Sequence, residues 1–420
     1  MKKRKAFLSG LQSRYSSSGS IHFFKYLFKW VFLCVIIGVL VGSASAIFLI
    51  SLKWATVYRE SHTWLIFLLP VAGLAIGLAY HYWGKDVVKG NNQLIDEFHA
   101  PKAVVPLKMA PLVFLGTVIT HLFGGSAGRE GTAVQMGGSI ADQFVKLFDL
   151  TPEDRKILLI VGVSAGFASV FGTPLAGGIF ALELFFLKRI RLNTILPGFL
   201  AAFIADYVCH VPWTVDHVVY EIPFSPPLHL SEWGWVILAG ICFGLAARLF
   251  SWATHAWHLA FQQKVAYPPL RPVVGGVFIV VAIIALGTTK YIGLGIPTIV
   301  AAFTDDLPPY DFLLKIALTS FTLGAGFKGG EVTPLFFIGA TLGNLLYWFI
   351  PLPLALLAGM GFVAVFAGAS NTPIASIMMG IELFGLESGV YIAIACAVAY
   401  LCSGHKGIYQ GPKKYKFKFF

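Results

Sequence analysis

Two glutamates stand in glycine-rich stretches of this chain and are the side chains best placed to do chemistry. Glu130 lies in Gly-Gly-Ser-Ala-Gly-Arg-Glu-Gly-Thr at 124–132, and Glu331 lies in Gly-Gly-Glu-Val-Thr-Pro at 329–334. Glycines allow backbone bends that other residues avoid. A helix that begins just after such a bend directs unpaired N–H groups and a positive dipole end into it. Each motif therefore predicts an anion site at a helix N-terminus.

A carboxylate at such a site competes with a permeant anion for the same positive end. A charged side chain inside a membrane costs about 2.5–3.5 kcal/mol or more, and burial favours its neutral, protonated form. Protonation then frees the site for an anion. We interpret Glu130 as a gating residue and proton carrier that links proton movement to anion movement. The alternative, in which both acids are solvated in interfacial loops, is disfavoured by the flanking glycines and by the repetition of the motif.

The two glutamate motifs belong to an internal duplication. Their Glu, Thr and a later Gly recur at an offset of 201 residues. Two further stretches, 172–183 and 371–382, share Thr-Pro, end in Glu and recur at an offset of 199. Chance matches of one glycine-rich motif are common, but two motifs in the same order at nearly the same offset are not. We therefore predict two related halves of about 200 residues each.

The composition predicts a membrane protein. Hydrophobic residues make up 57% of the chain and charged residues 12%, against roughly 25% charged in soluble proteins. Several apolar windows exceed the ~20 residues that cross a bilayer. Because these runs are continuous and do not alternate with polar residues, the predicted fold class is an all-α polytopic membrane protein and not a β-barrel. No cleavable signal peptide is evident.

The net charge of +11 is not taken as a sign of nucleic-acid binding, because the basic residues cluster at 2–5 and 413–418. The positive-inside rule then places both termini in the cytoplasm and predicts an even number of crossings of the cell inner membrane or plasma membrane.

The chain divides into five predicted segments. They are a cytoplasmic N-terminal tail over 1–25, a first membrane repeat over 26–211, a connecting segment rich in Pro, His and acids over 212–232, a second membrane repeat over 233–410 and a basic cytoplasmic tail over 411–420. Many apolar segments are short or interrupted by glycine, which indicates broken helices that meet near the membrane midplane. Duplication alone leaves the relative orientation of the halves open.

Neutral donors near the glycine-rich bends are Asn91, Asn92, Thr132 and Thr333. Each is equally well explained as a loop or cap residue. Tyr409 follows the last apolar run and, taken alone, would be an interfacial anchor; Lys328 would be a snorkelling residue. The five cysteines form no CxxC pair and the eleven histidines show no HxxxH spacing, so neither a disulfide framework nor a metal site is indicated, and no cofactor is expected.

The motifs resemble those of the CLC anion channels and transporters. They are GREGT at 128–132, GFKGGEVTPLF at 326–336, GTPLAGGIFALE at 172–183 and GIY at 407–409. Within that family the chain is similar to the fluoride-selective clade of proton/fluoride antiporters. GREGT stands where chloride-type members have GREGP, GNNQL at 90–94 stands in place of GSGIP, and GGEVTP stands in place of GGIFAP.

The resemblance implies the CLC fold of two inverted-topology repeats, a homodimer with one pore per subunit, and fluoride, protons and possibly chloride as the transported ions. It implies Glu130 as the gating glutamate, Glu331 and Thr333 as pore residues, Tyr409 as the central pore tyrosine and an anion-binding role for Asn91 or its neighbour. The full set assigned to anion binding or the pore is Asn91, Asn92, Gly128, Arg129, Gly131, Thr132, Glu331, Val332, Thr333 and Tyr409.

At one position the chain differs from the chloride exchangers of the family that it resembles. Leu184 stands where those proteins have an internal proton glutamate, so we expect Glu130 to carry the proton across by itself. No paired regulatory domains are expected after the membrane region.

The expected function is that of a proton-coupled fluoride antiporter that exports fluoride from the cytoplasm. Fluoride is small and strongly hydrated, so its desolvation demands close, strong donors, which Asn, Thr and protonated Glu side chains supply. A chloride or nitrate exchanger and a passive chloride channel of the same fold remain alternatives. An intramembrane enzyme that uses Glu130 and Glu331 as an acid pair is a further alternative, which the symmetric placement of the two acids disfavours.

Overall fold

The computed structural model describes residues 17–185, 192–227 and 230–409, and every regular element in these ranges is a helix. The first half contains, in chain order, α2 (Ser17–Ser61), η1 (Thr63–Leu68), α3 (Leu69–Tyr82), η2 (Lys85–Val87), α4 (Asn91–His99), α5 (Met109–Leu122), α6 (Glu130–Asp142), α7 (Phe144–Leu147), α8 (Pro152–Phe171), α9 (Pro174–Phe185) and α10 (Leu192–His210). The second half contains α11 (Leu230–Lys264), α12 (Leu270–Leu286), α13 (Ile296–Ala301), α14 (Asp311–Gly324), α15 (Val332–Leu346), α16 (Leu354–Ser370), α17 (Pro373–Phe384), η3 (Leu386–Ser388) and α18 (Gly389–Cys402).

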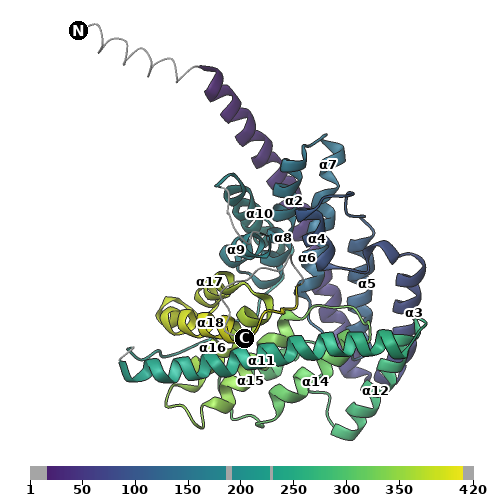
Figure 1. Ribbon diagram of the computed structural model, residues 1–420, viewed down its shortest axis with the longest axis vertical. Coiled ribbons are helices and arrows are strands. Elements are labelled where there is room, and N and C mark those ends of the chain that lie inside the picture. Colours follow the sequence, from purple (N-terminus) through teal and green to yellow (C-terminus); the bar gives the residue numbers. More distant parts are fainter. Residues whose placement is uncertain (1–16, 186–191, 228–229, 410–420) are drawn as a thin grey trace.

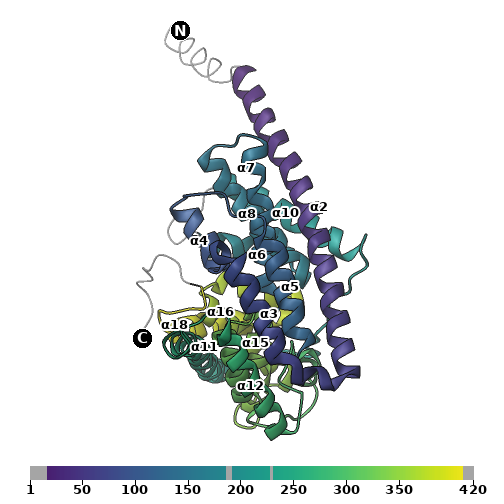
Figure 2. The same ribbon diagram turned by 90° about the vertical axis from the view of Figure 1, so that its right-hand side faces the viewer.

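The two halves of the chain pack against each other as two bodies of helices. Figure 1 shows the first half, coloured purple to teal, in the upper and right-hand part, and the second half, green to yellow, below it. Helix α2 runs along the length of the molecule, which is clearest in Figure 2. Within the halves, α6 packs on α8 and α15 packs on α16, and α9 and α17 join the halves to each other.

The observed boundaries differ from the predicted segments at two places. Helix α2 begins at Ser17, so the expected boundary between 25 and 26 falls inside a continuous helix. Once a helix is nucleated each further residue adds one hydrogen bond, so the apolar span extends into its polar flank. The connecting segment is irregular up to residue 227 and α11 begins at Leu230. Residues 1–16 and the basic tail at 411–420 lie outside the described residues.

Short helices dominate the described part of the chain. Three helical stretches are long and apolar enough to cross a membrane, namely Tyr26–Ser61, Thr63–Tyr82 and Glu232–Lys264. Eight others are apolar but only 10–17 residues long. At 1.5 Å per residue such helices are about 15–25 Å long, less than the ~30 Å hydrocarbon core. The prediction of short, interrupted helices is confirmed.

Glycines allow the closest helix contacts in both halves. A Cβ added at Gly137 of α6 would lie 2.1 Å from the carbonyl oxygen of Gly162 in α8, and one added at Gly339 of α15 would lie 1.9 Å from that of Gly361 in α16. Heavy atoms cannot approach so closely, so both crossings require a bare backbone. These crossings position α6 and α15, the two helices that begin at the glutamate motifs.

Two glutamates exchange caps between the halves. Glu183, near the end of α9, accepts from the backbone N–H groups of Ile374 (3.1 Å) and Ala375 (2.7 Å) at the start of α17. Glu382, near the end of α17, accepts from those of Leu175 (2.9 Å) and Ala176 (2.7 Å) at the start of α9. A carboxylate at a helix N-terminus satisfies orphan donors and interacts favourably with the dipole. The matching Thr-Pro…Glu stretches of the sequence therefore form one reciprocal contact.

The glycine crossing of α15 and α16 makes a stability prediction. We expect Gly339→Ala to lower the free energy of unfolding by about 2 kcal/mol, because the added methyl group overpacks a backbone contact. Gly234→Ala in α11 is the matched control, because its Cβ would have no neighbour within 4 Å. The midpoint of thermal unfolding in detergent measures both. Equal midpoints for the two variants would contradict the packing described here.

The reciprocal caps make a second prediction. We expect Glu382→Gln to lower the stability by about 1 kcal/mol, because an amide keeps one acceptor oxygen for two N–H donors and loses the charge at the helix N-terminus. Glu387→Gln, an exposed acid in η3, serves as the control and should leave the unfolding midpoint unchanged. An equal response of both variants would show that the cap contributes nothing.

Candidate functional site

The two glutamate motifs meet in the centre of the molecule. Gly128 N–H donates to the carbonyl of Gly330 (2.6 Å), and Gly330 N–H donates back to the carbonyl of Gly128 (2.8 Å), forming one antiparallel bridge. A Cβ at Gly330 would lie 2.7 Å from the backbone nitrogen of Gly131. Side chains at these positions would force the motifs apart. The glycines predicted to permit bends thus also permit a close approach between the halves.

Glu130 is fully buried and places its carboxylate on the other half of the chain. It is the first residue of α6, yet its carboxylate accepts from the backbone N–H of Thr333 (3.0 Å) and from the Thr333 hydroxyl. Thr333 lies in the first turn of α15, where backbone N–H groups have no partner inside the helix. Arg129 also donates to the carboxylate, from its backbone (3.2 Å) and from Nε (3.3 Å). The carboxylate therefore occupies an anion position at the start of α15.

Three more predicted residues gather at this point. A Cβ added at Gly131 would lie 3.0 Å from Asn91 Nδ2 and 3.8 Å from Glu331 Oε2. Asn91 begins α4 after Gly90, whose φ of 56° requires glycine, and its Oδ1 has no hydrogen-bond partner. Tyr409 is buried, its hydroxyl also lacks a partner among the described residues, and Glu331 and Glu130 are the charged groups that act on it.

The hydrogen bonds described for the Glu130 carboxylate come from Arg129 and Thr333 and involve none of the other predicted residues. The hydroxyl of Thr132 bonds to that of Thr117 in α5 (2.7 Å), so it joins two helices and does not reach the Glu130 carboxylate. Val332 is the first residue of α15 and is fully buried. The contact with Gly131 comes from Asn91, and Asn92 lies one position further along α4. Lys328 lies 3.9 Å from the ring centroid of Tyr80, a cation–π contact, and lines a separate cavity of about 590 Å³.

A set of polar contacts next to the glycine-rich bends was not predicted. Residue Ser126 donates to the carbonyl of Tyr291 (2.8 Å) and bonds to Thr319 of α14 (2.8 Å). The ring of His121 bonds to the carbonyl of Ala127 (2.9 Å). These contacts satisfy backbone groups of the bends, which cannot pair within a helix. The available signal was the run of polar residues in otherwise apolar helices, Thr117, Thr120 and His121 in α5 and Lys315, Thr319 and Thr322 in α14.

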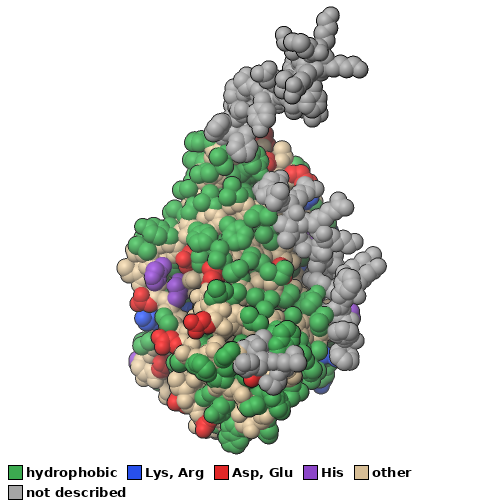
Figure 3. Space-filling model, turned by 90° about the vertical axis from the view of Figure 1, so that its left-hand side faces the viewer, with side chains coloured by type: hydrophobic (Ala, Val, Ile, Leu, Met, Phe, Trp, Pro, Cys, Tyr) green, Lys and Arg blue, Asp and Glu red, His purple; other side chains and the backbone are tan. Residues whose placement is uncertain are grey.

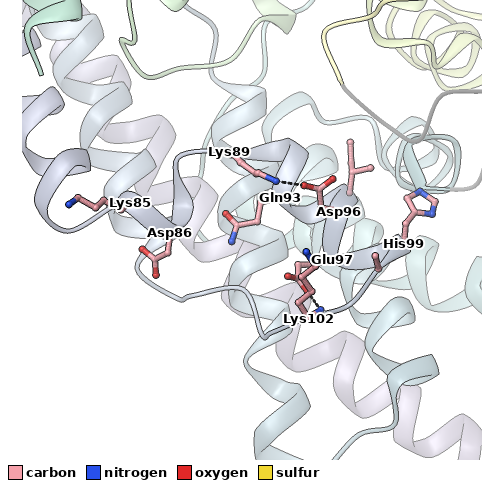
Figure 4. Close-up of a pocket in the computed structure, with 10 residues that line it drawn as sticks. Lys85, Asp86, Lys89, Gln93, Asp96, Glu97, His99 and Lys102 are labelled. Carbon is pink, nitrogen blue, oxygen red and sulfur yellow. Dashed lines mark hydrogen bonds and ion pairs between the residues drawn. The ribbon is translucent and has the colours of Figure 1, made fainter. Parts of the chain in front are cut away.

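Helix α4 also carries a surface hollow, of about 670 Å³, shown in Figure 4. In it Lys89 pairs with Asp96 (2.7 Å), and Glu97 accepts from the backbone N–H of Lys102 (2.8 Å). Arg155 of α8 holds Glu97 from the inner side (3.2 Å). These contacts tie α4, the helix that begins at Asn91, to Lys89, Lys102 and Arg155.

Within the described ranges no group of three His, Cys, Asp or Glu side chains is arranged to hold a metal ion. The five cysteines are free. The groups at the site are carboxylates, hydroxyls, an amide and the first turn of α15.

Known proteins share both the sequence and the architecture. Residues 72–404 match a family described as voltage gated chloride channel. A chloride/fluoride channel protein of Pseudomonas syringae pv. tomato is 52% identical over 412 residues, which cover 97% of this chain and 91% of that protein. The voltage-gated ClC-type chloride channel ClcB of Salmonella typhimurium is 28% identical, with coverages of 91% and 92%.

Solved structures agree. The crystal structure of a CLC-type fluoride/proton antiporter matches with a TM-score of 0.88 and 35% identity, over 91% of this chain and 97% of that one. A slow cyanobacterial Cl⁻/H⁺ antiporter has the same fold, with a TM-score of 0.78, 20% identity and coverages of 90% and 96%. Because the family match spans most of the chain and includes both glutamate motifs, this protein is a polytopic membrane protein of the voltage-gated chloride channel (CLC) family, with the CLC fold of two inverted-topology repeats.

Proposed function

We propose that this chain is a proton-coupled fluoride antiporter that exports fluoride from the cytoplasm. The observation that carries the proposal is the position of the Glu130 carboxylate on the backbone N–H and hydroxyl of Thr333, at the start of α15. An anion that enters this position must displace the carboxylate. A proton on the carboxylate removes its charge and weakens its hold on the helix N-terminus. Anion entry and protonation of Glu130 are thereby coupled.

The donors around this position suit fluoride. The Thr333 hydroxyl already acts as a donor there, and the Asn91 amide nitrogen and the Glu331 carboxyl group lie beside Gly131. A strongly hydrated anion loses much free energy when it leaves water, so close, strong donors must replace its hydration shell. The fluoride/proton antiporter structure supports fluoride, and the name of the Pseudomonas relative contains both fluoride and chloride. We also assign to anion binding or the pore four residues that belong to the two glutamate motifs, namely Gly128, Arg129, Gly131 and Val332.

The membrane setting completes the proposal. The positive-inside rule places both termini in the cytoplasm and the protein in the cell inner membrane or plasma membrane. The helices α9, α10, α17 and α18, with η3 before α18, carry exposed apolar side chains, among them Leu196 (58% exposed), Phe203 (47%), Ile374 (56%) and Leu386 (77%). Figure 3 shows a face of the molecule that is largely hydrophobic. We assign part of this surface to a homodimer contact and the rest to lipid.

Two other functions are less well supported. A chloride or nitrate exchanger, or a passive chloride channel, fits the names of the ClcB relatives but leaves the extra donors Asn91 and Thr333 without a purpose. An intramembrane enzyme would need a cleft for an organic substrate next to Glu130. The cavity there measures about 20 Å³, which holds about one water molecule.

Ion fluxes test the proposal. In liposomes that contain the purified protein, we expect fluoride efflux to exceed chloride efflux, because the close donors compensate the desolvation of fluoride best. We also expect an outward fluoride gradient to drive protons inward. Ion-selective electrodes and an internal pH dye report the two movements. Chloride efflux equal to that of fluoride would defeat the selectivity, and fluoride efflux without proton movement would defeat the antiport.

Glu130→Gln tests the gate. We expect it to abolish coupled turnover, because the amide carries no proton across and no charge to compete with the anion. Glu387→Gln, far from the bend in sequence and exposed, should keep the wild-type flux. Unchanged flux in Glu130→Gln would show that the gate lies elsewhere.

A further inference from the structure

The connection between the two halves covers the Glu130 site from one side. Its residues His217 and Tyr220 line the same cavity as Glu130, together with Arg129, Thr333 and the rings of Phe171, Phe336 and Phe362. The cavity volume is about 20 Å³. That is enough space for about one water molecule. Glu130 and His217 therefore border the same small cavity.

His217 has an unused nitrogen inside the protein. One of its ring nitrogens is held by the backbone of Val170, and Nε2 is buried without a hydrogen-bond partner. Asp206 of α10 presents Oδ1, which is also buried and unpartnered, at 3.9 Å from Nε2. Buried polar atoms without partners are rare and costly. A proton on Nε2 would give both groups an oppositely charged partner.

The cluster reaches the surface. His210, at the end of α10, is exposed and stacks on His217 with ring centroids 5.6 Å apart and an angle of 16° between the planes. The side chains of His217 and Asp206 are 17% and 22% exposed. The His217–Asp206 pair is thus partly exposed beside His210, and His217 also lines the cavity of the Glu130 carboxylate.

The cluster lies on the side opposite to the start of α2. Lys29, near that start, pairs with Asp154 at the beginning of α8 (2.7 Å), and the next residue, Arg155, pairs with Asp142 at the end of α6 (2.8 Å). Helix α6 therefore runs from Glu130 towards the α2 start. His217 lines a cavity at the other end of α6, which is the extracellular side in the orientation proposed above.

Other charged and titratable groups surround the pair. Arg129, His210 and Asp216 act on His217. His210 and the Glu382 carboxylate face Asp206, as does the thiol of Cys209. Burial, together with the charges of Arg129 and His210, lowers the pKa of the His217 imidazole to about 4. The ring is therefore neutral at rest, and its protonated form is acidic enough to pass a proton on.

We propose that His217, oriented by Asp206, is the relay through which extracellular protons reach Glu130. The inference rests on the proposed antiport function. A proton from the external solution adds to the lone pair of His217 Nε2, and the Asp206 carboxylate balances the imidazolium charge. The proton then passes through a water molecule in the cavity to the Glu130 carboxylate. His217 returns to its neutral form, and the neutral Glu130 releases Thr333 and the start of α15.

Right-side-out membrane vesicles from cells that express the full chain test the relay, because the orientation of the protein is preserved. Fluoride efflux is measured with an electrode while the pH of the medium is varied. We expect His217→Gln to slow efflux at neutral external pH by about a hundredfold, the lower end of what a positioned proton-transfer group contributes. Efflux should recover as the medium is acidified, because hydronium then protonates Glu130 directly, and externally added imidazole should also restore it.

Two further variants sharpen the test. Asp206→Asn should shift the pH profile in the same direction, and the double variant should be no slower than His217→Gln alone. If His217→Gln does not reach the membrane, Asp206→Asn carries the test. His62→Gln, a partly exposed histidine that follows α2, is the matched control and should keep the wild-type profile.

The possible failures are distinguishable. Wild-type vesicles without proton-coupled fluoride efflux would refute the proposed function itself. Coupled wild-type efflux with an unchanged pH profile in His217→Gln would overturn the relay alone. A loss of equal size at every pH, without rescue by imidazole, would assign His217 a purely structural part and overturn the relay as well.

Discussion

The structure depends on one hydrogen-bonded contact, the carboxylate of Glu130 on the first turn of α15. This contact exists because the first N–H groups of a helix have no partner within the helix, and because the bridge between Gly128 and Gly330 brings the two motifs together. The carboxylate is fully buried, where few alternative partners exist. In the proposed antiport mechanism, a change in its charge changes the contact, and the contact blocks the position that the anion takes.

A carboxylate at a helix N-terminus also joins the two repeats at a second place, where the contact is reciprocal. Glu183 and Glu382 cap each other's helices in a reciprocal pair, and that pair is closed on both sides. At the centre the exchange is one-sided. Glu130 crosses to α15, whereas the Glu331 carboxyl group lies beside Gly131, with Oε2 3.8 Å from the position of an added Cβ. The reciprocal caps of Glu183 and Glu382 are suited to stability. The one-sided contact lets the Glu130 carboxylate and the start of α15 exchange partners in the proposed mechanism.

Access to this centre differs on its two sides. Asn91 and Tyr409, whose unpartnered polar atoms lie near the glutamates, belong to α4 and to the segment after α18. The other side is covered by the connection between the repeats, which contributes His217 and Tyr220. A segment whose composition suggested only a linker thus forms a wall of the central cavity. The connecting segment links the two repeats, so it passes close to the place where their glutamate motifs meet.

The amino-acid sequence by itself determined the elements and their local chemistry. Glycine-rich bends, helix starts and a Glu at each bend are properties of short stretches, as is the capping box of Thr151 and Asp154 at the start of α8. The duplication was readable because it compares such stretches with each other. The fluoride-type residues were identified by resemblance to a known family, since the physical argument alone does not choose between halides.

Only the tertiary structure decided which partners these elements take. Glu130 begins α6, and its motif suggested an anion site at that helix, yet its carboxylate lies on α15, 203 residues away in the chain. Thr132 forms a hydrogen bond with Thr117, Lys328 lies over the ring of Tyr80, and His217 lines the same cavity as Glu130. Sequence patterns report the period and the ends of helices, which depend on near neighbours. The partner of a buried polar group depends on how helices from distant parts of the chain pack, because burial removes water and leaves each group only the partners that packing brings within reach.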